Sequence, residues 1–325
     1  MTPLHLAVAA AALWLPLHAP AQPSWKPERN VEIIVGTAAG AAPDKTARLI
    51  QRLWQERRIH EGPVTVVNKP GGGNVIAWSY LNQQPGNGHY QMIGNLNVLI
   101  SRGLGVSPYG HADFTWIAML FDEFFALSVR GDSPLANGRD LITRLQKDPS
   151  ALTIGVSTAI GGANHLSAAL ALSRAGIDPR RLRFVAFKGS AESVTALLGG
   201  HVDIVSAAAS AAVPFVRNGQ LRTIAVSSPQ RLGGALAQVP TWSELGVKAT
   251  MSNFRAVMAP RNTAPAVVRF WETRYAQLAV EDEWKRDLEA NLWAWNFLDT
   301  AKTMVAIQDS AADVEALVGT LGLRK

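Results

Sequence analysis

Apolar residues along this chain alternate between short extended runs and longer stretches with helical spacing. Val31–Val35, Val64–Val67 and Tyr90–Gly94 are short β-prone runs separated by polar or glycine-rich loops. Between the first two runs, Pro43–Gln55 repeats apolar residues at intervals of three or four, with proline in the first turn. Another helix is expected after the second run. Strands that alternate with helices predict an α/β fold in which helices cover both faces of a largely parallel sheet.

The same alternation resumes after Pro134. We expect strands at Leu152–Val156, Arg183–Phe187, Val202–Ser206 and Thr223–Ser227, and helices at Arg139–Lys147, Ala163–Arg174, Ala191–Leu198 and Ala211–Asn218. Everything after Asn253–Ala259 is expected to be helical, beginning at Pro265.

Two apolar extended segments stand between these patterns, and we expect the chain to cross between two domains there. The first lies within Phe114–Val129 and the second at Asn253–Ala259. Two crossings make the first domain discontinuous. The predicted domains are residues 22–124 with 251–325, and residues 125–250.

Residues 1–21 differ from the rest of the chain. Leu6–Leu17 is a nearly continuous apolar run, and Ala19-Pro20-Ala21 after it offers the small residues typical of a cleavage site. The run is too short to span a bilayer, so residues 1–21 are predicted to be a secretory signal peptide. A buried N-terminal helix is the alternative, which Pro16 and Pro20 disfavour. A periplasmic protein is therefore expected.

Composition limits the chemistry. The 325 residues are 48% hydrophobic and 17% charged, as in ordinary globular proteins, and none is a cysteine. Thiol catalysis, cysteine-ligated metals and an acylated cysteine anchor are thereby excluded, and nothing predicts a cofactor or a metal site. The net charge of +6 favours acidic solutes as partners. No recognisable nucleic-acid-binding motif accompanies it.

Small residues fill the loops between several strands and the helices that follow them. Such loops present free backbone N–H groups and the positive end of a helix dipole, which together bind anions without a charged side chain. In parallel sheets, ligands bind at the carboxyl ends of the strands. A tight turn or a flexible surface turn is the alternative explanation for each loop. The candidate ligand-binding residues in the first two loops are Thr37, Ala38, Ala39, Gly40, Ala41, Gly71, Gly72, Gly73 and Asn74.

Polar residues near later strand ends extend this candidate set. Hydroxyl and amide groups there can bond a carboxylate, and an ammonium group can attract one. His165 has the alternative of a capping or core histidine, and Lys188 that of a solvated surface lysine. The further candidates are Asn95, Ser157, Thr158, Asn164, His165, Lys188 and Ser206. No residue is assigned a catalytic role.

Several of these segments resemble one known family. The matching segments are Val67–Gly73, Phe187–Ser190, Leu197–Asp203, Gly219–Val226 and Val239–Gly246. From Trp25 to the C-terminus, the chain is similar to the Bug-type extracytoplasmic solute receptors, the TctC-like binding proteins of tripartite tricarboxylate transporters.

The resemblance implies a two-lobed periplasmic binding protein of type II, with helix-flanked parallel or mixed sheets and a central ligand cleft that closes around its ligand. It implies a small carboxylate held largely by backbone groups, here Thr37–Ala42 and Gly71–Asn74. A monomer that delivers its ligand to the membrane subunits of the transporter is the corresponding expectation.

Two segments depart from the family pattern. The first loop, within Val35–Asp44, lacks the usual proline and paired glycines. Ser206-Ala207-Ala208 replaces an acidic residue that is common after the later strand. Loss of that carboxylate disfavours an amino group, so a di- or aromatic carboxylate is a better candidate than an amino acid.

Other functions remain as alternatives. Gly155–Ala159 after a strand approximates the nucleophile elbow of a serine hydrolase, but no histidine follows His201 to complete the usual chain order. We therefore expect no enzyme activity. A periplasmic sensor or co-receptor for a signalling system uses the same kind of cleft and stays open. A cytoplasmic regulatory domain of similar architecture is disfavoured by the signal peptide and the missing DNA-binding helix pair.

Overall fold

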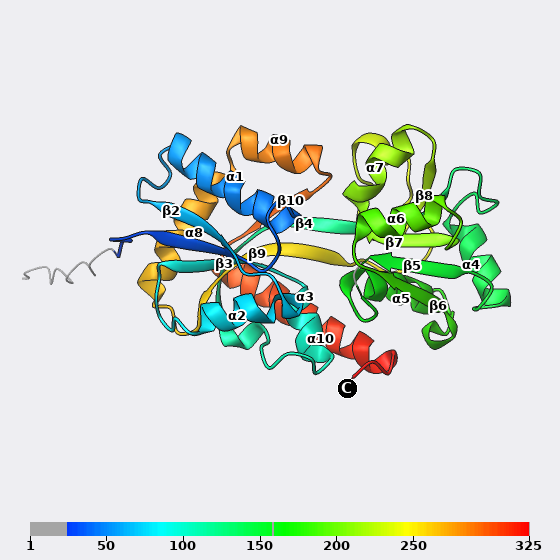
Figure 1. Cartoon of the computed structure of the whole chain (residues 1–325), viewed down its shortest axis with the longest axis horizontal. Coiled ribbons are helices and arrows are strands. Elements are labelled where there is room, and N and C mark those ends of the chain that lie inside the picture. Colours follow the sequence, from blue (N-terminus) through cyan, green and yellow to red (C-terminus); the bar gives the residue numbers. More distant parts are fainter. Residues whose placement is uncertain (1–24, 158, 325) are drawn as a thin grey trace, which may run out of the picture.

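The computed structural model describes residues 25–157 and 159–324. The predicted signal peptide, residues 1–21, lies outside the described residues, as does Thr158. In the described part of the chain, ten strands form two sheets, A and B, which share the long strand β4 (Phe114–Arg130). Figure 1 shows two groups of helices and strands joined at the middle of the molecule by this strand.

Sheet A has the strand order β2-β1-β3-β9-β4-β10. The first three strands are parallel, whereas β9 runs antiparallel to both β3 and β4. Its strands besides β4 are β1 (Val31–Val35), β2 (Val64–Asn68), β3 (Tyr90–Asn95), β9 (Ser252–Pro260) and β10 (Ala294–Leu298).

Sheet B has the order β6-β5-β7-β4-β8. β5 is parallel to both β6 and β7, and β4 runs antiparallel between β7 and β8. Its strands besides β4 are β5 (Thr153–Ser157), β6 (Arg183–Phe187), β7 (Ile204–Ala208) and β8 (Leu221–Val226).

Strand β4 passes from one sheet to the other between Phe124 and Phe125. Up to Phe124 it pairs with β9, and from Phe125 it pairs with β7 and β8. The chain returns at Met251 and Ser252, beside Ser227. The Ser227 hydroxyl accepts a hydrogen bond from the Phe125 N–H and donates one to the Met251 carbonyl, so it joins the two crossings. Strand β9 then begins at Ser252, opposite Phe124.

The prediction that Asn253–Ala259 is the second crossing was wrong. This segment lies entirely within sheet A, between β3 and β4, and the return crossing precedes it. Its apolar character reflects burial of a central strand on both faces, a pattern that is also expected of a crossing segment.

Helices cover both faces of sheet A. Neighbouring residues of one strand point into different cores, since Ile33 packs beneath α1, α8 and α9 while Ile34 packs on the side of α2, α3 and α10. These helices are α1 (Ala42–Glu56), α2 (Val75–Asn82), α3 (Asn97–Gly103), α8 (Pro265–Ala279), α9 (Asp282–Ala290) and α10 (Thr300–Thr320).

Sheet B is covered in the same way. Helices α4 and α5 pack on one face, and α6 and α7 pack on the other. Ala163, Leu166 and Ala169 of α5 also belong to the core on the α3 and α10 side of sheet A, so α5 links the two halves. These helices are α4 (Gly138–Lys147), α5 (Ala163–Arg174), α6 (Ser190–Leu198) and α7 (Ala209–Arg217), with 3-10 turns at η1 (Gly72–Asn74), η2 (His111–Asp113), η3 (Pro179–Arg181) and η4 (Gly234–Leu236).

The α/β class and the helices on both faces of the sheets are confirmed. Two expectations about single elements need correction, because α3 was not predicted and β10 is a strand within a region expected to be helical. Tertiary pairing with β4 decides the conformation of β10, overriding its local pattern. Among the described residues, no helix combines the length and the apolar character needed to cross a bilayer.

Candidate functional site

The described candidate residues lie towards the carboxyl ends of β1, β2, β3, β5, β6 and β7. They occupy the last three residues of a strand, the loop that follows it or the first turn of the next helix. Figure 1 shows the end of β1 and the start of α1 at the middle of the molecule, facing the sheet B half. This edge of the sheets is where ligands bind in open α/β folds.

The loop after β2 adopts a backbone conformation that strongly favours glycine. Gly71, Gly72, Gly73 and Asn74 have φ angles of 126°, 57°, 62° and 86°. Asparagine is among the non-glycine residues that best tolerate positive φ. The Gly-Gly-Gly-Asn sequence therefore fixes this loop, whose three glycines are exposed.

The first two loops touch through Gly36 and Asn74. A Cβ atom added at Gly36 would overlap the Asn74 amide oxygen, and only 7% of Asn74 is exposed. Glycine at position 36 thus makes room for the Asn74 side chain, which holds the two loops together.

Asp44 supports the first loop from inside. Its carboxylate accepts hydrogen bonds from the Gly40 N–H at 2.8 Å, Asn68 Nδ2 at 2.9 Å and Arg48 Nε at 3.0 Å. Burial alone would raise the pKa of Asp44, but these donors outweigh it and lower the pKa to about 2. Asp44 therefore serves the start of its own helix.

The first loop also contains backbone N–H donors that the described part of the protein leaves unpaired. Ala38, Ala39 and Gly40 are exposed. The N–H groups of Ala38 and Ala39 have no acceptor among the residues that the structure describes. Thr37 Oγ1 is buried and likewise has no partner there. Such groups at the start of α1 are suited to an anion.

The polar candidates around α5 bond mainly to one another. Ser157 Oγ lies 2.8 Å from Ser193 Oγ, Asn164 Nδ2 donates to the Ser157 carbonyl at 2.7 Å, and Ser206 Oγ donates to the Asn164 carbonyl at 2.8 Å. These bonds tie β5, α5, α6 and β7 together. Within the described chain, Asn164 Oδ1 is buried without a partner. The hydroxyl of Ser157 faces Ser193, and in the described part of the chain no hydrogen bond joins it to a histidine that could activate it as a nucleophile.

His165 caps the loop before its own helix. Its Nδ1 accepts a hydrogen bond from the Gly161 N–H at 3.0 Å, and its ring packs edge-on against Phe184. Burial lowers the pKa of His165 to about 4, so the imidazole is neutral at pH 7. The structure gives this residue the capping position that was its alternative explanation.

Three helix starts share this capping geometry but differ in charge. Gly40 donates to Asp44, Gly161 to His165 and the Lys188 N–H to Glu192 at 2.8 Å. Carboxylates offset the positive dipole ends of α1 and α6, whereas a neutral imidazole leaves that of α5 uncompensated.

The remaining candidates lie at the periphery of this group. Lys188 is exposed, so its ammonium group is in solvent. Asn95 is half-buried, and its side-chain oxygen accepts a hydrogen bond from the Asn97 N–H at 3.0 Å.

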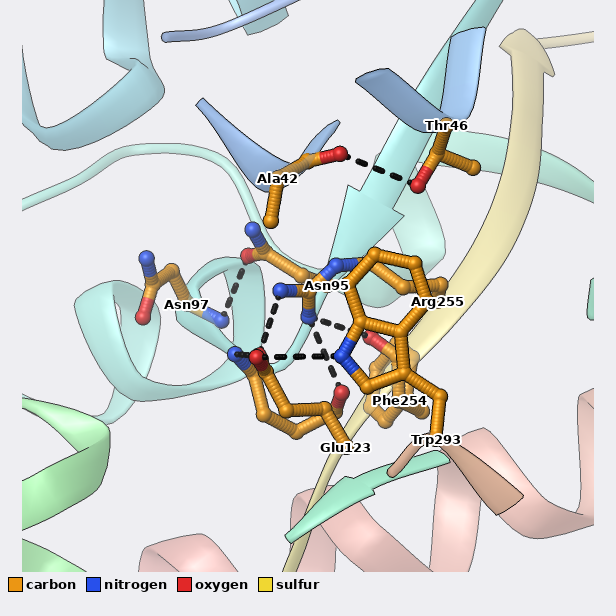
Figure 2. A network of polar contacts seen from close by, with 9 residues as sticks. Ala42, Thr46, Asn95, Asn97, Glu123, Phe254, Arg255 and Trp293 are labelled. Atoms are coloured by element: carbon orange, nitrogen blue, oxygen red, sulfur yellow. Dashed lines mark hydrogen bonds and ion pairs between the residues drawn. The ribbon is translucent and has the colours of Figure 1, made fainter. Parts of the chain in front are cut away.

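A buried ion pair lies beneath the first loop, and the sequence analysis did not identify it. Arg255 Nη2 of β9 lies 2.7 Å from Glu123 Oε2 of β4, and the two side chains are 4% and 8% exposed. Arg255 also donates to the Asn253 and Phe254 carbonyls, and Trp293 Nε1 donates to Glu123 at 3.4 Å. Figure 2 shows this network under the first turn of α1 and beside Asn95. The sequence did contain a signal for this pair, because Glu123 and Arg255 interrupt otherwise apolar extended segments.

The contact between the first two loops predicts a specific rescue. Gly36→Ala should lower the free energy of unfolding by about 1–3 kcal/mol, because its methyl group displaces the Asn74 amide. Adding Asn74→Gly should recover much of the loss, since glycine keeps the positive φ at that position. Gly189→Ala is the control, because a Cβ there meets open space. Urea denaturation measures all four proteins, and no rescue in the double variant would contradict the contact.

Burial of His165 predicts a pH dependence. The unfolded chain binds a proton below pH 6.5, but the folded protein binds one only near pH 4. The free energy of unfolding should therefore fall by about 3 kcal/mol as the pH drops from 6.5 to 4. His165→Gln should reduce this slope, and His201→Gln at an exposed position should not. Equal slopes in wild type and His165→Gln would refute the assignment.

The Arg255–Glu123 pair predicts a large loss when one partner is removed. Arg255→Met should lower the free energy of unfolding by about 3–5 kcal/mol, because it leaves a buried carboxylate uncompensated. Glu123→Leu in the same protein should restore most of it. The exposed pair Arg231–Glu244 is the control, and Arg231→Met should cost less than about 1 kcal/mol. Similar losses at both positions in urea titrations would show that burial does not matter here.

Comparisons with known proteins agree with this geometry. Residues 47–323 match the model of the tripartite tricarboxylate transporter family receptor, TctC. BugT of Bordetella pertussis is 28% identical over 255 residues, which cover 77% of this chain and 76% of BugT.

Two solved structures are similar over most of the chain. A TctC solute-binding protein from Polaromonas, solved without ligand, has a TM-score of 0.78 at 23% identity and covers 91% of this chain and 99% of its own. Rpa4515 of R. palustris, solved with adipate, has a TM-score of 0.77 at 26% identity and covers 91% and 98%. The expected periplasmic binding protein fold and the resemblance to Bug-type receptors are thereby confirmed. The chain belongs to the TctC family of receptors of tripartite tricarboxylate transporters.

Proposed function

We propose that this receptor binds a small carboxylate without an amino group, a dicarboxylate or an aromatic carboxylate, in the periplasm. It delivers that ligand to the membrane subunits of a tripartite tricarboxylate transporter. The ligand lies between the sheet A and sheet B halves, against the loops before α1, α2 and α5.

The preference for an anion rests on backbone donors that the described chain leaves unpaired before α1 and on the helix dipole at the start of α5. The start of α5 is capped by a neutral histidine, and the exposed N–H groups of Ala38 and Ala39 have no acceptor within the described chain. Open donors and an uncompensated helix dipole together stabilise a carboxylate. Rpa4515, the adipate-bound relative, supports a ligand of this class.

The preference against an amino group comes from the acidic residues nearby. Asp44, Glu123 and Glu192 are each engaged by donors of the protein itself. Ser206-Ala207-Ala208 contributes no carboxylate at the end of β7. A ligand ammonium would thus be buried without an ionic partner, which is costly.

Binding in the cleft is proposed to involve movement of two domains. They are residues 22–124 with 251–325, and residues 125–250. Among the described residues, the chain passes between them at Phe124–Phe125 and at Met251–Ser252, and Ser227 bonds both connections. Rotation about these connections would close the loops over a ligand.

The ligand class is tested with matched pairs that differ by one amino group. Glutarate should bind at least tenfold more tightly than glutamate, and adipate more tightly than 2-aminoadipate. At 100 times its dissociation constant, a ligand adds about 2.7 kcal/mol of stability, which a thermal melt detects. Titration of tryptophan fluorescence gives the constants. Tight binding of glutamate with no binding of glutarate would refute the proposed ligand class.

A further inference from the structure

The net charge of this protein is confined to one half. Residues 125–250 contain 13 of the 31 Lys and Arg residues but only 7 of the 25 Asp and Glu residues. They therefore carry the entire net charge of +6, and the rest of the chain is balanced. Such asymmetry between two halves points to a charged partner for one of them.

Exposed cations of this half gather where α4, α5 and β6 meet. The ends of α4 and α5 are adjacent, since Gln146 Nε2 donates to the Ala175 carbonyl at 2.9 Å. We define the basic face by six exposed residues, which are Arg144, Lys147, Arg174, Arg180, Arg181 and Arg183.

Few acidic groups offset the basic face. Asp178 pairs with Arg180 at 3.0 Å. Asp148 is bonded to Ser150 and lies near Arg144 and Arg181, and these interactions lower its pKa. A third carboxylate, Asp203, accepts a hydrogen bond from the N–H of Thr153, which is paired with Arg183. With all three carboxylates ionised, the face still carries a net charge of +3.

A hollow of about 690 Å³ adjoins the basic face at Arg174. One wall is the end of α5, another is Lys248–Ser252, and a third is Ser310–Thr320 of α10. Hydroxyl groups and the Lys248 ammonium line it together with apolar side chains, and Asp313 is the acidic residue among the described lining residues.

The walls of this hollow come from both halves of the molecule. Helix α10 packs on α3 and β4 of the sheet A half and reaches α5 of the sheet B half (Figure 1). The shape of the hollow therefore depends on how the two halves are oriented. A partner that inserts into it would distinguish one orientation from another.

We propose that the basic face and the hollow dock an acidic, protruding protein segment of the membrane partner. This inference rests on the proposed delivery function. Arginine and lysine favour carboxylates by charge, and hydroxyl groups donate to them. A protein segment fits better than a lipid surface, because a flat bilayer has nothing to fill a hollow between two halves.

The test reverses the charge of the face and compares it with an equal change elsewhere. The docking variant is Arg144→Glu with Arg174→Glu and Arg181→Glu. The control variant is Arg29→Glu with Arg261→Glu and Arg269→Glu, three exposed positions in the sheet A half. Both variants change the net charge by the same amount.

Binding is measured by interferometry to nanodiscs that contain the transporter membrane subunits, at 50 and 200 mM NaCl. The docking variant should lose at least tenfold in affinity and most of the salt dependence, whereas the control variant should resemble wild type. Equal losses in both variants, no loss in the docking variant, or no binding by wild type would overturn the proposal.

Empty phosphatidylglycerol nanodiscs test the lipid alternative, and equal binding to them would also overturn it. Glutarate-induced thermal shifts of the same proteins separate the two proposals. If glutarate does not shift the melting temperature of the wild type, the ligand assignment is contradicted and the docking proposal is not. If the docking variant keeps this shift, its lower affinity for the nanodiscs is a loss of docking and not of ligand binding.

Discussion

The fold depends on one continuous strand that belongs to two sheets. β4 completes sheet A up to Phe124 and enters sheet B at Phe125, so neither sheet is complete without it. Glu123, one residue before this change, is held by Arg255 of β9, and Ser227 bonds Phe125 one residue after it. A buried charge next to apolar sheet residues is tolerated only with its partner. The pair thus fixes the register of β4 and β9 where the two halves begin to diverge.

The loops near this ion pair are held by hydrogen bonds of their own. Those bonds determine which loop groups remain available to a ligand. Asp44, His165 and Glu192 each accept the N–H group four residues before them, so the loops are held by their own helices. The donors left over are backbone N–H groups, whose direction is set by the loop conformation. Recognition by such groups is specific for an acceptor and tolerant of the rest of the ligand. Such recognition suits the carboxylate ligand proposed for this receptor.

Much of the fold could be predicted from periodicity, because β1, α5 and β6 are bounded by clear turn and helix-start residues. The loop at Gly71–Asn74 was identifiable for the same reason, since consecutive glycines indicate positive φ. The nature of β10 was not predictable, because its conformation comes from pairing with β4. Nor could the sequence show that Ser157 and Ser206 bond inside the protein, since hydroxyl groups look alike whether they face a ligand or a neighbour.

The proposed ligand loops and the proposed docking face are electrostatically separate, because they lie at opposite ends of the same elements. His165 is in the first turn of α5 and Arg174 ends it, and Arg183 begins β6 while Lys188 follows it. A helix of this length spans about 18 Å, and screening in physiological salt acts within about 8 Å. Helix dipoles act only within their first turn. A ligand at the proposed site is therefore governed by the local donors of the loops, and a partner at the proposed docking surface by the charge of the basic face.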